Sequence, residues 1–87
     1  MTEALLQIDD IAQLLGDHIS REILGTGNPV DREQNLLLDG AVDSLGMLKL
    51  VAFIEMTYDI KVPPEQFTIE NFRSVNVISN YVSSLLI

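Results

Sequence analysis

Hydrophobic residues recur at helical spacing along residues 3–24, the first of three such segments in this chain. They are mostly separated by three or four positions and therefore form one stripe along a helix. The stripe consists of Leu5, Ile8, Ile11, Ala12, Leu15, Ile19 and Ile23. Gly16 interrupts this segment at a cost of about 1 kcal/mol relative to alanine, and His18 lies beside the stripe as an ordinary boundary residue. The pattern predicts a first helix over residues 3–24.

The second segment, residues 44–58, is hydrophobic over more than half of the circumference of a helix. Its apolar residues are Leu45, Met47, Leu48, Leu50, Val51, Ala52, Ile54 and Tyr58. One buried stripe does not use all of them, so we expect some to face a partner protein, although a helix wedged between two others would show the same pattern. The helix is predicted to end within residues 59–64, because residues before Pro63 and Pro64 disfavour the helical conformation.

A short helical turn is predicted over residues 68–72, with Thr68 as its cap, before the third long segment. Ser74 is expected to cap that last helix. Its apolar positions are Val75, Ile78, Tyr81, Val82 and Leu85. No alternating strand pattern of useful length is present. The sequence therefore predicts an all-α fold, a small four-helix bundle of three main helices and one short helix, in a single domain over residues 1–87.

A long connection, residues 25–43, separates the first two helices. Gly25, Gly27 and Pro29 end the first helix. A loop of this length in a small domain is usually functional or disordered. Residues 36–38 are three adjacent leucines, which are expected to pack against the helices and hold the loop down. We therefore expect an ordered loop with room for one short helical turn.

The charge balance is acidic, with 13 acidic and 5 basic residues and a net charge of −8. Such a chain repels nucleic acid, which is therefore not expected as a partner. Positively charged protein surfaces are its natural counterparts, although an acidic surface more often serves only solubility. No apolar run approaches the roughly 20 residues of a membrane span, and the first residues lack the basic stretch of a targeting segment. We expect a monomeric cytoplasmic protein that does not contact membranes.

The chain contains no cysteine and one histidine. It therefore lacks disulfides, thiolate metal sites and a thiol nucleophile of its own. A metal site built on several imidazoles is excluded, and carboxylates at the spacing of a calcium-binding loop are not found, so no metal ligands are predicted. A serine hydrolase would need a base, an orienting partner and an oxyanion hole. One histidine and the lack of a Gly-x-Ser-x-Gly elbow argue against such an enzyme.

Asp43 and Ser44 stand where the long loop meets the second helix. Both offer side-chain oxygens to the free N–H groups of a first helical turn, so capping alone explains such a pair. The triplet Asp43-Ser44-Leu45 in this helical order nevertheless resembles the attachment motif of acyl and peptidyl carrier proteins. "LVAFIEMTYDIKVPPEQFT", residues 50–68, resembles the rest of their second helix and the loop after it, and "ENFRSVNVISNYV", residues 70–82, resembles their third and fourth helices. The first helix matches only by its pattern.

The resemblance implies that Ser44 receives a 4′-phosphopantetheine arm from coenzyme A, attached by a separate phosphopantetheinyl transferase. The thiol of the arm would then carry acyl, aminoacyl or polyketide intermediates as thioesters between enzymes. An adenylating ligase or acyltransferase would load the arm, and synthase or tailoring enzymes would receive the cargo. Asp43 would cap the helix and help the transferase through its metal ion. The absence of cysteine agrees with an imported thiol, and the start of a helix favours an attached phosphate.

The chain departs from the carriers of fatty acid synthesis on both sides of the triplet. Gly40-Ala41-Val42 replaces their Leu-Gly-x, and Gly46, Met47 and Lys49 stand where acidic residues are usual. The pattern favours freestanding carriers of natural-product, polyketide, nonribosomal peptide or amino-acid-loading pathways, including D-alanine carrier-like proteins.

We expect docking of partners to rest on apolar contacts from the second helix. The residues concerned are Leu45, Met47, Leu48 and Ala52. Gly46 either permits close approach near the serine or is a tolerated helix defect. The alternative function is a small acidic helical adaptor that binds a partner protein without a prosthetic group.

Overall fold

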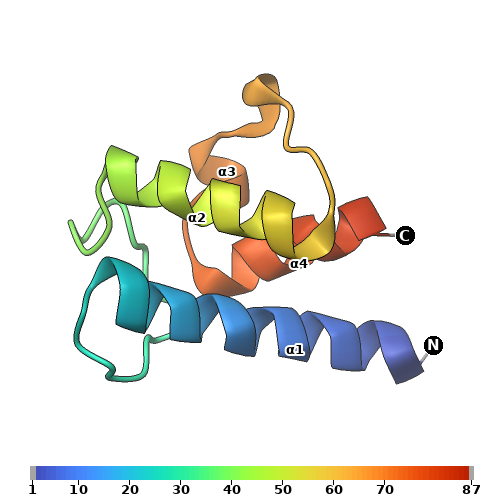
Figure 1. Ribbon diagram of the computed structural model, residues 1–87, viewed down its shortest axis with the longest axis horizontal. Coiled ribbons are helices and arrows are strands. Elements are labelled where there is room, and N and C mark those ends of the chain that lie inside the picture. The colour runs from blue at the N-terminus through green and yellow to red at the C-terminus, as the bar shows by residue number, and fades with distance from the viewer. Residues whose placement is uncertain (1, 87) are drawn as a thin grey trace.

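The computed structural model describes the backbone of residues 2–86 and the side chains of residues 8–86. Four α-helices, a π-helical turn and a 3₁₀ turn make up this part of the chain, which contains no strand (Figure 1). In chain order they are α1 (Thr2–His18), η1 (Ile19–Ile23), α2 (Ser44–Tyr58), η2 (Pro64–Gln66), α3 (Ile69–Phe72) and α4 (Val75–Leu86). The all-α fold and its three main helices plus one short helix are confirmed, and η2 is an addition that the sequence did not predict.

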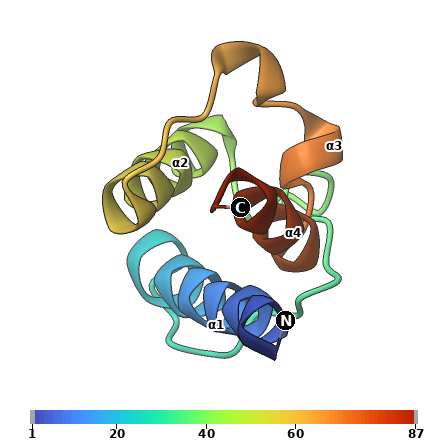
Figure 2. The same ribbon diagram turned by 90° about the vertical axis from the view of Figure 1, so that its right-hand side faces the viewer.

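The three long helices α1, α2 and α4 surround one hydrophobic core. Figure 2 shows them around a common centre, with α3 and the segment before it on the side of α2 and α4. Each helix contributes fully buried side chains, and the loop before α2 adds Leu36 and Val42. The fully buried members with the largest side chains are Phe72, Ile11, Leu15, Ile19, Leu36, Met47, Leu50, Ile54 and Ile78. Burial of this apolar surface is what holds α2, and therefore its first turn, in place.

The first helical segment ends differently from the uniform helix that was predicted. The α-helix stops at His18, and residues 19–23 continue as a π turn in which Leu24 N donates to Ile19 O at 2.8 Å. The loop takes over the carbonyl of Ser20, which accepts from the N–H groups of residues 26 and 27. Gly25 then adopts a left-handed φ of 70°, a conformation that costs glycine little. The helix thus ends where loop amides compete for its last carbonyls.

The long loop is ordered, but it contains hydrogen-bonded turns instead of the short helix that was allowed for. Leu36 is fully buried and its N–H donates to Arg73 O at 2.8 Å. Leu37 is half-buried, whereas Leu38 is 82% exposed. The prediction that all three leucines pack inward is therefore wrong for Leu38. The side chain of Asn35 accepts from the N–H of Leu38 at 2.9 Å, and this turn directs the third leucine outward.

The structure contains some of the predicted side-chain caps at the helix ends and lacks others. α2 covers the predicted residues, and the Oγ of Ser74 accepts from Val77 N at 3.2 Å at the start of α4, as expected. Thr68 precedes α3 but makes no side-chain cap; its carbonyl accepts from Phe72 N instead. Asp59 ends α2 with a left-handed φ of 55°. None of the helices in the described part of the chain has the length and hydrophobicity needed to cross a membrane.

Candidate functional site

The candidate site is the first turn of α2. Asp43 has an extended backbone, and its Oδ1 accepts from Gly46 N at 2.8 Å while its carbonyl accepts from Met47 N at 2.9 Å. This is a side-chain cap of the kind that aspartate favours. Ser44 follows as the first helical residue, and the side chains of Ser44 and Leu45 are both exposed. Within the described residues, the hydroxyl of Ser44 takes part in no intramolecular hydrogen bond, so it faces solvent as a free group.

The backbone at this turn favours an anion next to Ser44. The cap uses the N–H of Gly46, and the backbone of Asp43 uses the N–H of Met47. The N–H groups of Ser44 and Leu45 remain at the positive end of a helix of 15 residues. A phosphodiester on the Ser44 oxygen would lie beside these groups. The exposed hydroxyl and the donors around it therefore fit a phosphopantetheine arm, for which the carboxylate of Asp43 leaves room by turning back onto Gly46.

An apolar depression adjoins Ser44 between α2 and α3. It has a volume of about 210 Å³ and is lined by Leu37, Ser44, Met47, Leu48, Phe67, Thr68, Ile69 and Phe72. A second depression of about 430 Å³ shares Leu37 and Ile69 with it and extends to Leu38. We refer to these two adjoining depressions together as the trough. The sequence did not predict this trough; adjacent leucines ahead of a capped serine were its only signal.

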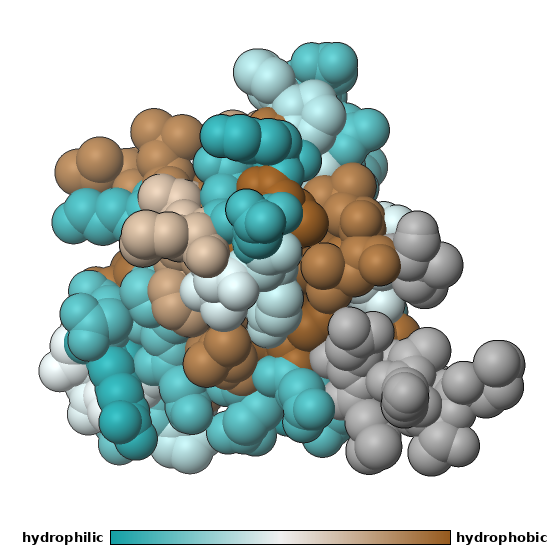
Figure 3. Space-filling model, turned by 45° about the vertical axis from the view of Figure 1, so that its right-hand side comes forward, coloured by the Kyte–Doolittle hydropathy of each residue, from teal (hydrophilic) through white to brown (hydrophobic). Residues whose placement is uncertain are grey.

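Exposed hydrophobic side chains form a row along α2. Leu45, Leu48 and Ala52 are exposed, as predicted for a partner-facing surface, and Met56 at 81% exposure extends the row toward the end of the helix. Figure 3 shows hydrophobic surface at the upper left, on the side where α2 begins. We call Leu45, Leu48, Ala52 and Met56 the α2 ridge. Beyond it, Leu38 and Ile69 stand exposed beside the trough, and these two residues and Met56 were missed by the sequence analysis.

Met47 does not lie on the α2 ridge. Its side chain is only 1% exposed and points into the core together with Leu50 and Ile54, one and two turns further along the helix. The prediction that Met47 forms part of the exposed docking surface is therefore wrong, although its side chain also forms part of the wall of the trough. Gly46, the residue before Met47, is buried as well, whereas Leu48, the residue after it, is exposed, so burial changes sharply around the helix.

His18 has a packing role at the boundary between α1 and α2. Its ring stacks on that of Phe53, with the ring centres 3.8 Å apart and an angle of 13° between the planes. Burial lowers the pKa of His18 below its ordinary value of 6.5, and this effect outweighs the opposing one of Glu22. His18 is absent from the trough at Ser44, and no other side chain in the lining residues is a base. The carboxylate next to Ser44 in sequence is that of Asp43, whose Oδ1 accepts from Gly46 N.

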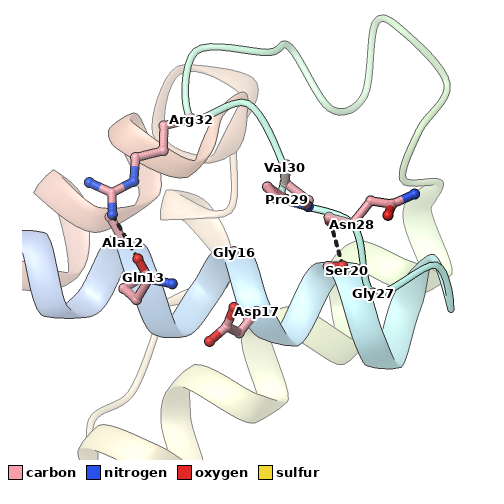
Figure 4. A pocket seen from close by; sticks show the side chains of 10 residues that line it. All are labelled: Ala12, Gln13, Gly16, Asp17, Ser20, Gly27, Asn28, Pro29, Val30 and Arg32. Carbon is pink, nitrogen blue, oxygen red and sulfur yellow. Dashed lines mark hydrogen bonds between the residues drawn. The ribbon is translucent and has the colours of Figure 1, made fainter.

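A further cavity of about 210 Å³ lies between α1 and the loop (Figure 4). The Oγ of Ser20 donates to Asn28 O at 2.6 Å on one side of it. On the other side Arg32 donates to Asp9 at 2.7 Å and to Gln13 at 3.3 Å. These bonds fasten the loop to α1 on both sides of the cavity. Residues 8–86 also contain no cluster of three potential metal ligands.

Residues 18–82 match the family described as the phosphopantetheine attachment site. The match begins at the end of α1 and includes Ser44 and all later helices up to the middle of α4. The chain belongs to this family. It is a carrier protein with a covalently attached 4′-phosphopantetheine, a non-catalytic protein that a phosphopantetheinyl transferase modifies. The resemblance to carrier proteins is thereby confirmed.

Among curated proteins, the chain is similar to a D-alanyl carrier protein from Streptococcus uberis (strain ATCC BAA-854 / 0140J). The two are 35% identical over 54 residues, which make up 62% of this chain and 68% of the relative.

Proposed function

We propose that Ser44 carries the 4′-phosphopantetheine arm and that this carrier serves an amino-acid-loading pathway. The observation that carries the assignment is the exposure of the serines. Within the family match, residues 18–82, the other serines are Ser20, Ser74 and Ser79, and all three are buried. Ser44 alone among the serines of that range offers an exposed hydroxyl, and it does so at a capped helix start whose free N–H groups suit a phosphate.

The transfer reaction requires few chemical groups from the carrier itself. The Ser44 oxygen forms a bond to the phosphorus that bears pantetheine, the phosphoanhydride bond of coenzyme A breaks, and adenosine bisphosphate leaves. We assign the hydroxyl proton to a base of the transferase, since Oδ1 of the neighbouring Asp43 already accepts from Gly46 N. Asp43 holds the first turn of α2 through its cap, and its exposed carboxylate would be available to a metal ion held by the transferase.

An amino acid is the proposed cargo, activated by an adenylating ligase and passed on by a downstream enzyme. The relative's name, D-alanyl carrier protein, supports an amino acid over a polyketide or peptide intermediate. The α2 ridge supports an apolar docking surface for the loading enzyme, with Lys49 as the one charged residue among the exposed positions from Leu45 to Ala52. Such a surface differs from one that relies on acidic side chains. We place this reaction in the cytoplasm, with a monomeric carrier whose residues 1–87 form one domain.

Mass spectrometry of the intact protein tests the assignment. The apo protein is incubated with coenzyme A, magnesium and a broad-specificity phosphopantetheinyl transferase, and it should gain the mass of one arm. Ser44→Ala should abolish this gain while circular dichroism shows an unchanged helical fold. Ser84→Ala is the matched control, since Ser84 is also exposed but lies in the last turns of α4, and it should be modified like the native chain.

Two results would overturn the proposal. Modification that persists in Ser44→Ala would place the arm elsewhere, and a native chain that stays unmodified would favour the adaptor function instead. The cargo is tested separately, by offering the holo protein to adenylating ligases with D-alanine, other amino acids and fatty acids in parallel. Loading with fatty acids in preference to every amino acid would contradict the amino-acid assignment but leave Ser44 as the attachment site.

A further inference from the structure

Gly46 occupies a buried position in the first turn of α2, two residues after Ser44. A Cβ atom at this position would lie 3.0 Å from Val42 Cγ1, 3.2 Å from Ile23 Cγ2 and 3.3 Å from Asp43 Oδ1. Carbon atoms in ordinary contact are about 3.5 to 4.0 Å apart, so a side chain at residue 46 requires its neighbours to shift by a few tenths of an ångström. This packing lies within the chain and argues against a tolerated helix defect, whereas a close approach of a partner near the serine stays a prediction.

Gly16 in α1 provides the comparison within the same chain. Apart from its chain neighbours and the backbone of its own helix, no heavy atom lies within 4 Å of the position that its Cβ would occupy. Alanine at this position is therefore expected to gain the helix propensity of about 1 kcal/mol without a clash. The same propensity gain is available at Gly46, but there it is opposed by three contacts. The difference between the two helical glycines is thus a difference in packing and not in local backbone preference.

The three atoms around Gly46 belong to three residues, two at the end of the loop and one in η1. Val42 is the last buried residue of the loop and is 1% exposed, and its N–H donates to Leu36 O at 3.0 Å. Ile23 is the last residue of the π turn η1, and Asp43 is the cap of α2. A fully buried valine has little space to turn away, because protein interiors are closely packed. A side chain at residue 46 would therefore displace the first turn of α2 or disturb its cap.

A displacement of the first turn of α2 would also move Ser44, which lies in this turn. Ser44 and Leu45 are exposed, so the first turn contacts the body of the protein through Gly46 and Met47. Gly46 is also where α2 meets η1, and π turns occur often at functional sites. We propose that Gly46 is a positioning residue for the modification of Ser44. Because Gly46 has no side chain, the first turn of α2 packs directly on Val42 and Ile23, a contact that we call the seat. The seat sets the direction of the Ser44 hydroxyl.

This inference rests on the proposed function of Ser44, and it concerns the rate of one step. A seat that is displaced by a few tenths of an ångström leaves the α2 ridge in place for recognition, since its residues extend over the whole helix. It changes the approach of the Ser44 oxygen to phosphorus, and such reactions are sensitive to small misplacements. The expected signature is a lower kcat for the transferase with an unchanged KM for the carrier.

The test compares kcat and KM of a phosphopantetheinyl transferase for five variants of the apo protein and the native chain. Gly46→Ala should lower kcat about 10-fold and leave KM within about twofold, because misplacement affects the transition state more than binding. Gly16→Ala, the control, should match the native chain in both constants. Val42→Ala makes room for a side chain at residue 46, so adding Gly46→Ala to Val42→Ala should change kcat little. Ile23→Ala loosens the seat without adding atoms and should also lower kcat alone.

The possible outcomes separate this inference from the proposed function. A native kcat in Gly46→Ala, a rise of KM without loss of kcat, or an equal loss in Gly16→Ala would overturn it. So would a Gly46→Ala effect of the same size with and without Val42→Ala. If Gly46→Ala does not fold, as judged by circular dichroism, Ile23→Ala decides, and a native kcat in that variant refutes the positioning role. A native chain that accepts no arm at all would instead refute the function of Ser44.

Discussion

Met47 and Leu48 are neighbours in sequence, yet the structure assigns their side chains to opposite sides of α2. Met47 is 1% exposed and belongs to the core, whereas Leu48 is 52% exposed and belongs to the α2 ridge. Truncation of each to alanine removes a similar number of apolar atoms. The pair therefore distinguishes the contribution of burial to stability from that of an exposed surface to docking.

The two truncations should differ clearly in the free energy of unfolding. Replacing a buried methionine by alanine costs about 2 to 5 kcal/mol, because the loss of transfer free energy is joined by a cavity. Full burial of a leucine side chain contributes about 1.5 to 3 kcal/mol, and Leu48 has only about half of its surface buried, so Leu48→Ala should cost about 1 kcal/mol. With a urea m-value of about 1 kcal/mol/M for a small domain, Met47→Ala moves the midpoint by about 2 M or more.

Loading of the holo protein should show the opposite order. Leu48→Ala should reduce kcat/KM of the adenylating ligase about 10-fold, the effect of losing an apolar interface contact of about 1.4 kcal/mol. Met47→Ala, assayed at a temperature where circular dichroism shows it to be folded, should reduce kcat/KM less. The reasoning is refuted if Leu48→Ala destabilises the fold more than Met47→Ala, or if it leaves loading unchanged while Met47→Ala impairs it.

Three further predictions concern the electrostatics of the fold and of docking. Because the pKa of His18 is lowered in the folded state, the unfolded chain binds the proton first as pH falls through 6.5. The free energy of unfolding of the native chain should therefore drop between pH 7.5 and about pH 5.5. Urea titrations at both pH values should show a smaller drop for His18→Gln. Asp43→Ala should cost about 1 kcal/mol in urea unfolding through loss of the cap, and Asp43→Asn less, since asparagine caps almost equally well; equal losses would argue against a hydrogen-bonded cap. Raising salt well above physiological strength should slow native loading only modestly, because screening leaves apolar contacts intact. A many-fold loss of loading rate, or brisk processing of the native chain by fatty acid synthase enzymes, would show that charge dominates docking. Lys49→Glu should leave native loading unchanged or impair it, yet improve processing by those enzymes.

The helices themselves were predictable because their signals are local. α2 begins after Asp43 and ends before the two prolines, as the sequence indicates, since caps and prolines act on the residues next to them. The inward and outward sides of α2 were not predictable in the same way. Apolar residues cover most of its circumference, so only the positions of α1, α3 and α4 decide that Met47 is buried and Leu48 exposed. The prediction for Met47 failed because burial is a property of the whole fold.

Ser44, the proposed attachment residue, was recognisable for the same local reason, and its surroundings were not. Asp43-Ser44-Leu45 is contiguous in sequence, whereas the trough beside it combines side chains from the loop, α2 and α3. The loop illustrates the difference. Leu36 and Leu38 have the same side chain two positions apart, but a hydrogen bond from Leu36 to Arg73 buries one, and the turn at Asn35 exposes the other. No pattern of hydrophobicity contains either of these hydrogen bonds, the long-range one to Arg73 least of all.

The helical turn that bears Ser44 is held firmly on its inner side and exposed on its outer side. The cap by Asp43, the seat of Gly46 and the bond from Val42 to Leu36 all restrain the turn that bears the hydroxyl. The residues that flank it on the outside, including Leu45 and the ridge beyond, make few contacts with the rest of the chain. A flexible arm supplies the motion between enzymes, so the protein gains by presenting its attachment point without movement. With the arm on Ser44, as proposed, successive partners would meet the same oxygen in the same place, beside the ridge on which we expect them to dock.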